Sequence, residues 1–503
     1  MPKSQSTPKT ASIVPINELG VHVPVPVELA SENFVWNGVK IVPFFAVMTL
    51  AIGLWFSPVP NGLDLKTWQL FTIFLSTIAG IIAKPLPMGS IAVIALSACT
   101  MTHTLTLEEA LNSYSSKIVW LVLAAFFIAR GFIKTGLGAR IAYYFVGAMG
   151  KSTLGLGYSL VLTELLLAPV VPSSTARGGG IVFPIVSALN QEYGSHPQDG
   201  TQRKIGGYLY KLCFHANTIT GAMFITALAG NPLIVSLASK VDVDLSWYTW
   251  ALAAIVPGMI CLAVLPLLLF VIYPPELKST PAAPKVAKEK LKQMGAMSFE
   301  EKIMLTTFLT LLGLWIFGPQ LSIDAGTAAI FGLAVLMLTG VLNWDDILKE
   351  QAAWNTFIWL GCLLMMAELL NELGMMTWFS THIQTVVGSL DWTAAMAVLV
   401  LVYFFSHYLF AGVTSHITSM YSAFLVVSIA TGAPPMLAAL LFAALSSLSG
   451  GLTHYGTGTG PVFFGAGYLS ISEWWRLGAI VSIVNMVIWV VAGSLWWKII
   501  GLW

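Results

Sequence analysis

Charged side chains are scarce in this sequence of 503 residues: Lys, Arg, Asp and Glu together make up 9% of it, whereas 57% is hydrophobic. A soluble protein of this length needs far more charge to cover its surface, so the composition argues against that class. The formal net charge of +1 gives no reason to expect nucleic acid as a partner. We therefore expect a protein that is embedded in membrane lipid.

Cysteine and catalytic signatures are also scarce. The four cysteines lie in apolar runs without the spacing of a metal site, so we interpret them as small hydrophobic residues and expect no metal and no cofactor. The sequence contains no His-Glu-x-x-His, no Walker loop and no Gly-x-Ser-x-Gly. Without such an acid, base and nucleophile set, a membrane-embedded hydrolase is disfavoured, and we do not expect an enzyme.

The N-terminal region is polar and rich in proline over about the first 35 residues, with no apolar h-region. We expect no cleaved signal peptide and a cytoplasmic N-terminal segment over residues 1–36. Long apolar runs follow, many with the length of a spanning helix. We predict an all-α polytopic membrane protein with about 11 transmembrane segments: a first membrane half at 37–275, a Lys-rich linker at 276–302 and a second half at 303–503.

The distribution of positive charge predicts the orientation. Lysine and arginine gather in the segments on one side of the predicted membrane, the linker included, whereas the segments 241–245 and 318–326 on the other side contain none. The positive-inside rule then places the N-terminus and the linker in the cytoplasm. The short N-terminal segment favours a bacterial inner membrane over an organelle envelope.

The stretch Ala168-Pro-Val-Val-Pro-Ser-Ser-Thr-Ala-Arg-Gly-Gly-Gly180 separates two apolar runs that are each too short to cross a bilayer. It predicts a re-entrant hairpin at about 152–190, which enters from the cytoplasm and has its tip deep in the membrane. The hydroxyls of Ser173, Ser174 and Thr175 precede a helix start, whose free N–H groups favour an anion. Arg177 adds a positive charge, and charged residues at that depth usually have a role.

An internal repeat organises the rest of the chain. Leu107-Glu-Glu-Ala-Leu111 recurs as Trp344-Asp-Asp-Ile-Leu348, and a second hairpin is predicted at about 391–431, entering from outside. Each half also contains an interrupted helix, broken at 229–232 in the first and at 456–460 in the second. Inverted repeats with two re-entrant hairpins and two broken helices are typical of secondary transporters, which bind substrate between the repeats.

Alignment of the two repeats places Thr175 on Thr414 and Arg177 on His416. Two alternatives stay open at this point. Arg177 could be paired structurally, for example with Glu164 in the same hairpin, and His416 could be a hydrogen-bonded packing residue. Three further histidines lie near polar breaks, where a structural role is favoured over a functional one: His215, His407 and His454.

Four motifs in this order resemble the divalent anion:sodium symporter family, in its branch of 2-oxoglutarate/malate translocators and citrate/succinate antiporters. They are Pro-Ser-Ser-Thr-Ala-Arg-Gly-Gly-Gly-Ile at 172–181, Thr-Ala-Leu-Ala-Gly-Asn-Pro at 226–232, Phe-Ala-Gly-Val-Thr-Ser-His at 410–416 and Leu-Thr-His-Tyr-Gly-Thr-Gly at 452–458. The resemblance implies an elevator-type homodimer in membrane lipid, with both hairpins on a moving transport domain. It also implies that a Ser-Asn-Thr sequence at each tip binds the substrate carboxylates.

The chain departs from that Ser-Asn-Thr pattern, since the first tip reads Ser-Ser-Thr and the second reads Gly-Val-Thr. The resemblance implies the following substrate-binding residues: Ser173, Ser174, Thr175, Asn231, Thr414, Thr457 and Gly458. In sodium-coupled relatives each tip and its facing broken-helix loop cage a sodium ion, largely with backbone oxygens. Here Arg177 and His416 are expected to supply fixed positive charge in place of that ion.

These features predict a sodium-independent antiporter of four- and five-carbon dicarboxylates such as 2-oxoglutarate, malate, succinate and fumarate. The charge of Arg177 would remain uncompensated in an empty carrier and would hinder its return through the bilayer. The alternative is a sodium-coupled symporter of di- or tricarboxylates, which sodium-stimulated uptake would identify. An anion channel, which would conduct without a counter-substrate, is a weaker alternative from another class.

Overall fold

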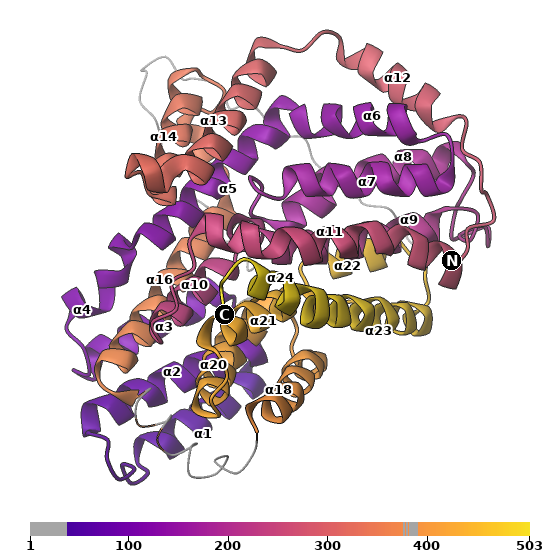
Figure 1. Ribbon diagram of the computed structural model, residues 1–503. Helices are drawn as coiled ribbons and strands as arrows, with labels where there is room; N and C mark the ends of the chain where they lie inside the picture. The colour runs from indigo at the N-terminus through magenta and orange to yellow at the C-terminus, as the bar shows by residue number, and fades with distance from the viewer. Residues whose placement is uncertain (1–37, 376–377, 379–380, 382–390) are drawn as a thin grey trace, which may run out of the picture. The chain divides into compact units, whose positions relative to one another are not determined.

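The computed structural model describes residues 38–375, 378, 381 and 391–503. The predicted N-terminal segment at 1–36 lies outside the described residues, as does most of an interfacial segment expected near 375–389. Within the described part the regular structure is helical, and its strand-like pairing is an isolated bridge between Ser152 and Ser279 (Figure 1).

Long apolar helices account for most of residues 40–503. In the described part of the chain, eight helical stretches are long and apolar enough to cross a membrane. They are Leu65–Ala83 (α2), Lys117–Thr135 (α5), Trp247–Ile272 (α11), Phe299–Gly318 within α13 (Phe299–Leu321), Gln351–Glu372 (α16), Trp392–Leu409, Val413–Ala430 and Ile471–Ile499. Shorter apolar helices are Ile41–Trp55 (α1), Met88–Met101 (α3), Thr153–Leu167 (α7), Ala325–Leu338 (α14) and Pro435–Ser449 (α21). The predicted all-α, multi-pass membrane class is confirmed.

The two halves of the chain repeat the same order of elements and pack crosswise. α3 of the first half lies against α16 of the second, and α14 of the second half lies against α5 of the first. The two matching sequence segments both fold as short helices with a capping box, α4 (Leu107–Leu111) behind Thr106 and α15 (Trp344–Lys349) behind Asn343. In each box the cap side chain and an acidic side chain three residues later satisfy each other's backbone N–H groups.

The segment predicted as a solvated linker, 276–302, contains a helix, α12 (Ala283–Met294), which packs against α6 (Leu137–Met149). Ala283 and Ala287 are buried on one face of α12, whereas its lysines are on the other faces. The spacing of four residues places both alanines on one side of the helix, and their small side chains allow close approach. The high lysine content therefore indicated the exposed face of α12 but gave no sign of the face that packs against α6.

A buried ion pair fastens α6 to the start of α13. Arg140 Nε donates to Glu301 Oε1 at 2.6 Å, and its Nη2 donates to Oε2 of the same carboxylate at 2.9 Å. The guanidinium also donates to the carbonyl of Gly295 at 3.0 Å. Both side chains are 4% exposed, so each one depends on the other for its charge compensation.

Replacing Glu301 by Gln would leave the Arg140 guanidinium buried without its carboxylate. We expect the free energy of unfolding to fall by about 3–5 kcal/mol, seen as a lower midpoint of thermal unfolding in detergent. Glu300→Gln, an exposed neighbour in the same turn, is the matched control and should change the midpoint little. Equal midpoints for the two variants would contradict this role of the pair.

Candidate functional site

Hairpin 1 consists of two short arms that meet at a proline-rich tip. Its elements are α7, tip 1 (residues 168–175), a π-helical segment η2 (Ala176–Val182) and α8 (Phe183–Glu192). The hydroxyl of Ser173 accepts from the N–H of Ala176 at 3.1 Å. Ser173 is therefore used to cap the second arm, since its oxygen satisfies one of the free N–H groups at the helix start.

Hairpin 2 has the same order of elements. They are α18 (Trp392–Ser406), η4 (His407–Leu409), tip 2 (residues 410–414), α19 (Val413–His416), a π-helical segment η5 (Ile417–Tyr421) and α20 (Ser422–Ala430). Gly412 has φ 134° and ψ 148°, a conformation that residues with a side chain rarely adopt. In both hairpins a π-helical segment lies in the second arm, and such segments are frequent at functional sites.

Two interrupted helices complete the arrangement, and each meets the hairpin of the other half. Break 1 (residues 224–230) separates α9 (Gly206–Met223) from α10 (Asn231–Ser239), and break 2 (residues 450–459) separates α21 from α22 (Gly460–Gly465). A Cβ on Gly458 of break 2 would collide with the hydroxyl of Thr175. A Cβ on Gly230 of break 1 would lie 3.8 Å from the hydroxyl of Thr414. Each tip threonine thus lies beside a glycine of the opposite break.

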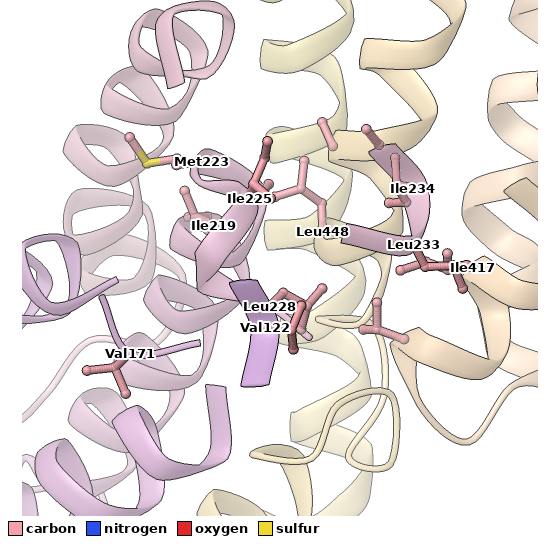
Figure 2. Close-up of a cluster of buried hydrophobic side chains, with 14 of the residues drawn as sticks. Val122, Val171, Ile219, Met223, Ile225, Leu228, Leu233, Ile234, Ile417 and Leu448 are labelled. Carbon is pink, nitrogen blue, oxygen red and sulfur yellow. The ribbon is translucent and has the colours of Figure 1, made fainter. Parts of the chain in front are cut away.

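Break 1 is held by apolar packing from several elements. Figure 2 shows this cluster, in which side chains of α9 and α10 surround the break together with residues of α5, α21, tip 1 and hairpin 2. The labelled residues are Val122, Val171, Ile219, Met223, Ile225, Leu228, Leu233, Ile234, Ile417 and Leu448. All ten are buried, so the irregular backbone at break 1 is shielded from the surroundings.

Three tip hydroxyls are available to bind an anion. Ser174, Thr175 and Thr414 make no side-chain hydrogen bond to any described residue, and none of the three is fully buried. Gly458, beside Thr175, is exposed and leaves its backbone open to approach. Hydroxyls without protein partners, placed at two helix starts, are donors suited to carboxylate oxygens.

Two other candidates from the sequence lie behind this surface. Asn231 is fully buried, and its Nδ2 donates to the carbonyls of Gly221 at 2.8 Å and Phe224 at 2.9 Å. Its amide therefore satisfies the carbonyls at the end of α9. Thr457 is 7% exposed, and its hydroxyl pairs with that of Thr459 at 2.8 Å. Asn231 therefore stabilises the backbone at break 1, and Thr457 stabilises the backbone at break 2.

Arg177 is buried completely and is paired. Its Nε donates to Glu164 Oε1 at 2.5 Å, and its Nη1 donates to the carbonyls of Val171 at 2.5 Å and Ala227 at 3.1 Å. The guanidinium thus joins both arms of hairpin 1 to break 1. Because Glu164 neutralises it, Arg177 is not the uncompensated charge that we expected from the sequence. The structural pairing left open there is the arrangement found.

In hairpin 2 two histidines make the contacts that correspond to those of Arg177 in hairpin 1. His416 Nε2 lies 3.0 Å from the carbonyl of Tyr403 and 2.9 Å from the hydroxyl of Ser406, so it closes the hairpin on itself. His407 Nε2 lies 3.0 Å from the carbonyl of Gly456 and joins the hairpin to break 2. Both rings are fully buried, and neither faces a carboxylate among the described residues.

Several site residues were not singled out by the sequence. Asn217 on α9 donates to Glu164 Oε1 at 2.6 Å and to the carbonyl of Ser174 at 3.2 Å, and it accepts from Thr459 at 3.3 Å. It therefore connects tip 1 to break 2. Lys84 at the end of α2 donates to the carbonyl of Ala411 in tip 2 at 3.0 Å. No local sequence pattern marked Asn217 or Lys84, because their hydrogen-bond partners are distant from them in sequence.

The other two histidines differ from each other in their surroundings. His454 accepts from the indole N–H of Trp475 at 3.2 Å, which fits a packing role. His215 is fully buried on α9, and neither of its ring nitrogens has a hydrogen-bond partner in the described part of the chain.

Spanning helices, two hairpins and two broken helices that meet crosswise define a secondary membrane transporter. The sequence model described as the sodium:sulfate symporter transmembrane region matches residues 38–503, and the chain belongs to this family. The resemblance to divalent anion:sodium symporters is thereby confirmed.

Relatives and solved structures agree with this assignment. The chain is 51% identical to the chloroplastic dicarboxylate transporter 1 of Spinacia oleracea over 93% of this chain and 83% of that protein, and 49% identical to its namesake from Arabidopsis thaliana over 100% and 89%. It is 53% identical to YflS of Bacillus subtilis (93% and 98% covered), whose name proposes a malate transporter. The crystal structure of the YdaH transporter from Alcanivorax borkumensis has the same fold, with a TM-score of 0.53 at 11% identity over 91% and 98% of the two chains.

Thr175→Val and Thr414→Val each remove one unpartnered tip hydroxyl while keeping the shape of the side chain. We expect each variant to bind malate about 10–150-fold more weakly, the loss of one hydrogen bond to a charged ligand. Thr77→Val is the matched control, because its hydroxyl bonds within α2. Unchanged malate affinity in both tip variants, measured by titration of purified protein, would remove the tips from the binding site.

Proposed function

We propose that this protein exchanges four- and five-carbon dicarboxylates, such as 2-oxoglutarate, malate, succinate and fumarate, across a membrane without sodium. The observation that carries the proposal is the set of unpartnered hydroxyls at the two tips. Ser174 and Thr175 supply donors on hairpin 1, and Thr414 supplies one on hairpin 2. Two separate donor groups suit a ligand with a carboxylate at each end. The names of the chloroplastic relatives support the same substrate class.

Sodium independence is proposed from the contacts of Arg177. Its guanidinium donates to the carbonyl of Val171 in tip 1 and to that of Ala227 in break 1. According to the resemblance, a tip and a broken-helix loop supply the backbone oxygens that cage each sodium ion in symporting relatives, and tip 1 and break 1 are segments of these two kinds. A fixed cation that already uses these two carbonyls competes with sodium for them as ligands.

Exchange is proposed from the cost of moving the tips without substrate. Because Glu164 compensates Arg177, that arginine does not hinder the return of an empty carrier by its charge. The tip hydroxyls and helix starts would, however, enter the membrane interior without acceptors, which costs free energy. A bound dicarboxylate satisfies them, so the loaded carrier crosses more readily.

The proposal includes further parts taken from the resemblance and from the charge pattern. They are an elevator-type movement of both hairpins, a homodimer, a cytoplasmic N-terminus and a bacterial inner membrane. The second candidate function is a sodium-coupled symporter of di- or tricarboxylates. It is favoured by the name of the family, which refers to sodium and sulfate.

The test is uptake of labelled malate into sodium-free proteoliposomes, with and without malate or 2-oxoglutarate inside. We expect uptake only when a dicarboxylate is inside, because each inward movement then has a loaded return. Vesicles that contain lactate serve as the matched control, since a monocarboxylate cannot occupy both tips.

Equal uptake with and without internal dicarboxylate would rule out obligatory exchange. If sodium on the outside raised uptake in vesicles without internal substrate, the symporter would be the better assignment. Uptake that needs neither sodium nor counter-substrate and does not saturate would instead indicate a channel.

A further inference from the structure

Tip 2 offers a ligand fewer donors than tip 1 does. Tip 1 ends in Ser-Ser-Thr and tip 2 in Gly-Val-Thr, so the side-chain donor of tip 2 is the hydroxyl of Thr414. The two basic residues that follow the tips do not make up the difference. Arg177 is paired with Glu164, and His416 is bonded within its own hairpin. A carboxylate at tip 2 therefore needs a positive charge from another element.

A lysine outside the hairpins reaches tip 2. Lys84, the residue that follows α2, donates from its ammonium to the carbonyl of Ala411 at 3.0 Å. Ala411 precedes Thr414 by three residues, so their Cα atoms are at most about 11 Å apart. α2 also lies against α19, the short helix that begins with Val413 and Thr414. The ammonium is thus held by direct contact at the tip that carries the Thr414 hydroxyl.

The charge of Lys84 is available to a ligand. The side chain is exposed, and it forms no ion pair with an acidic side chain in the part of the chain that the structure describes. An ammonium has three N–H donors, and the described residues accept one of them, through Ala411. Hydrogen bonds to a carboxylate are stronger than those to a neutral carbonyl. A ligand can therefore use the remaining donors or replace Ala411.

Open space adjoins this contact. Gly412 lies between Ala411 and Thr414 in the chain, and a Cβ added to it would meet no atom within 4 Å. Ala411 itself is exposed. The tip therefore has room for a small ligand beside the backbone that connects the lysine contact to Thr414.

The backbone of Lys84 adopts a conformation that favours glycine. It has φ 51° and ψ 49°, in the left-handed region, immediately before Pro85. A side chain makes this region costly, and a residue before proline usually adopts extended backbone. Glycine is the usual residue at this place after a helix. A lysine in the last turn of α2 would suit the helix dipole without this strain, so the strained position indicates a role for the side chain itself.

We propose that Lys84 is a substrate-binding residue, whose ammonium binds the carboxylate at tip 2 together with the hydroxyl of Thr414. The proposal rests on the dicarboxylate transport proposed above and names the positive charge that the site offers to a dianion. Because Lys84 lies at the end of α2 and not on a hairpin, its contact with the ligand forms where hairpin 2 lies against α2.

The experiment measures malate affinity by titration of purified full-length protein, together with the midpoint of thermal unfolding in detergent. Lys84→Met removes the charge, and Lys84→Arg keeps it. Lys84→Gly removes the charge and also suits the left-handed backbone. Lys40→Met is the matched control. Lys40 is exposed and its backbone N–H bonds to the carbonyl of Pro85, next to Lys84, but its side chain donates to no described residue of a tip.

We expect malate to bind about tenfold more weakly in Lys84→Met and Lys84→Gly, the lower end of the range for hydrogen bonds to charged groups, because Lys84 is exposed. Lys84→Arg and Lys40→Met should keep the affinity of the unsubstituted protein. Lys84→Gly should bind weakly without a lower midpoint, since glycine relieves the backbone strain. A lysine that only held hairpin 2 against α2 would instead lower the midpoint and the affinity together.

Lys84→Cys gives a second measurement that does not depend on comparing folded states of different variants. The four native cysteines are buried, so a thiol reagent should modify Cys at position 84 first. Labelling with 2-aminoethyl methanethiosulfonate returns an ammonium to this position and should restore malate affinity. Methyl methanethiosulfonate, which is neutral, should not restore it. Bound malate should also slow the labelling, because the ligand lies against this side chain.

Unchanged malate affinity in Lys84→Met and Lys84→Gly would overturn the inference. Equal effects of the charged and neutral reagents would overturn it too, and so would a loss of affinity found only where the midpoint falls. Absence of malate binding by the unsubstituted protein would contradict the proposed function and the inference with it. Malate binding that does not depend on Lys84 would contradict the inference alone, so the two failures are distinguishable.

Discussion

Hairpin 1 depends on a carboxylate and a guanidinium that are both shielded from solvent. Glu164 on the first arm accepts from Arg177 on the second, and the same carboxylate oxygen also accepts from Asn217 on α9. Removing one member of such a pair leaves a buried charge, at a cost of about 3–5 kcal/mol. Tip 1, break 1 and break 2 are all connected through these three side chains, so the position of the tip hydroxyls follows from one ionic contact.

The second half reaches a similar geometry with different chemistry. His416 and His407 bond to backbone carbonyls within hairpin 2 and in break 2, where the first half uses a single arginine. No acidic side chain compensates either histidine in the described residues. The two tips are therefore related in backbone arrangement and in their threonines, while the fixed ion pair belongs only to the first.

Much of the fold could be predicted because its signals are local. Apolar runs, the prolines and hydroxyls at 168–175 and the glycines at 456–460 marked helices, hairpins and breaks directly. The contacts between them could not be predicted in the same way. Nothing in the sequence showed that Glu164, rather than a substrate, compensates the charge of Arg177. The sequence also did not show that Ser173 caps a helix or that the amide of Asn231 donates to backbone carbonyls. Each outcome depends on partners that only the folded chain brings together, and α12 was missed because lysines concealed two buried alanines.

Central to the proposed function is that Arg177, a paired and permanent cation, occupies one carbonyl of tip 1 and one of break 1 and so makes sodium unnecessary. The most direct measurement is equilibrium binding of malate to the purified protein, titrated in sodium chloride and in choline chloride at equal ionic strength. We predict the same affinity in both salts, because no sodium is taken up with the substrate. An affinity about tenfold higher or more in sodium, equivalent to about 1.4 kcal/mol of coupling, would contradict the account.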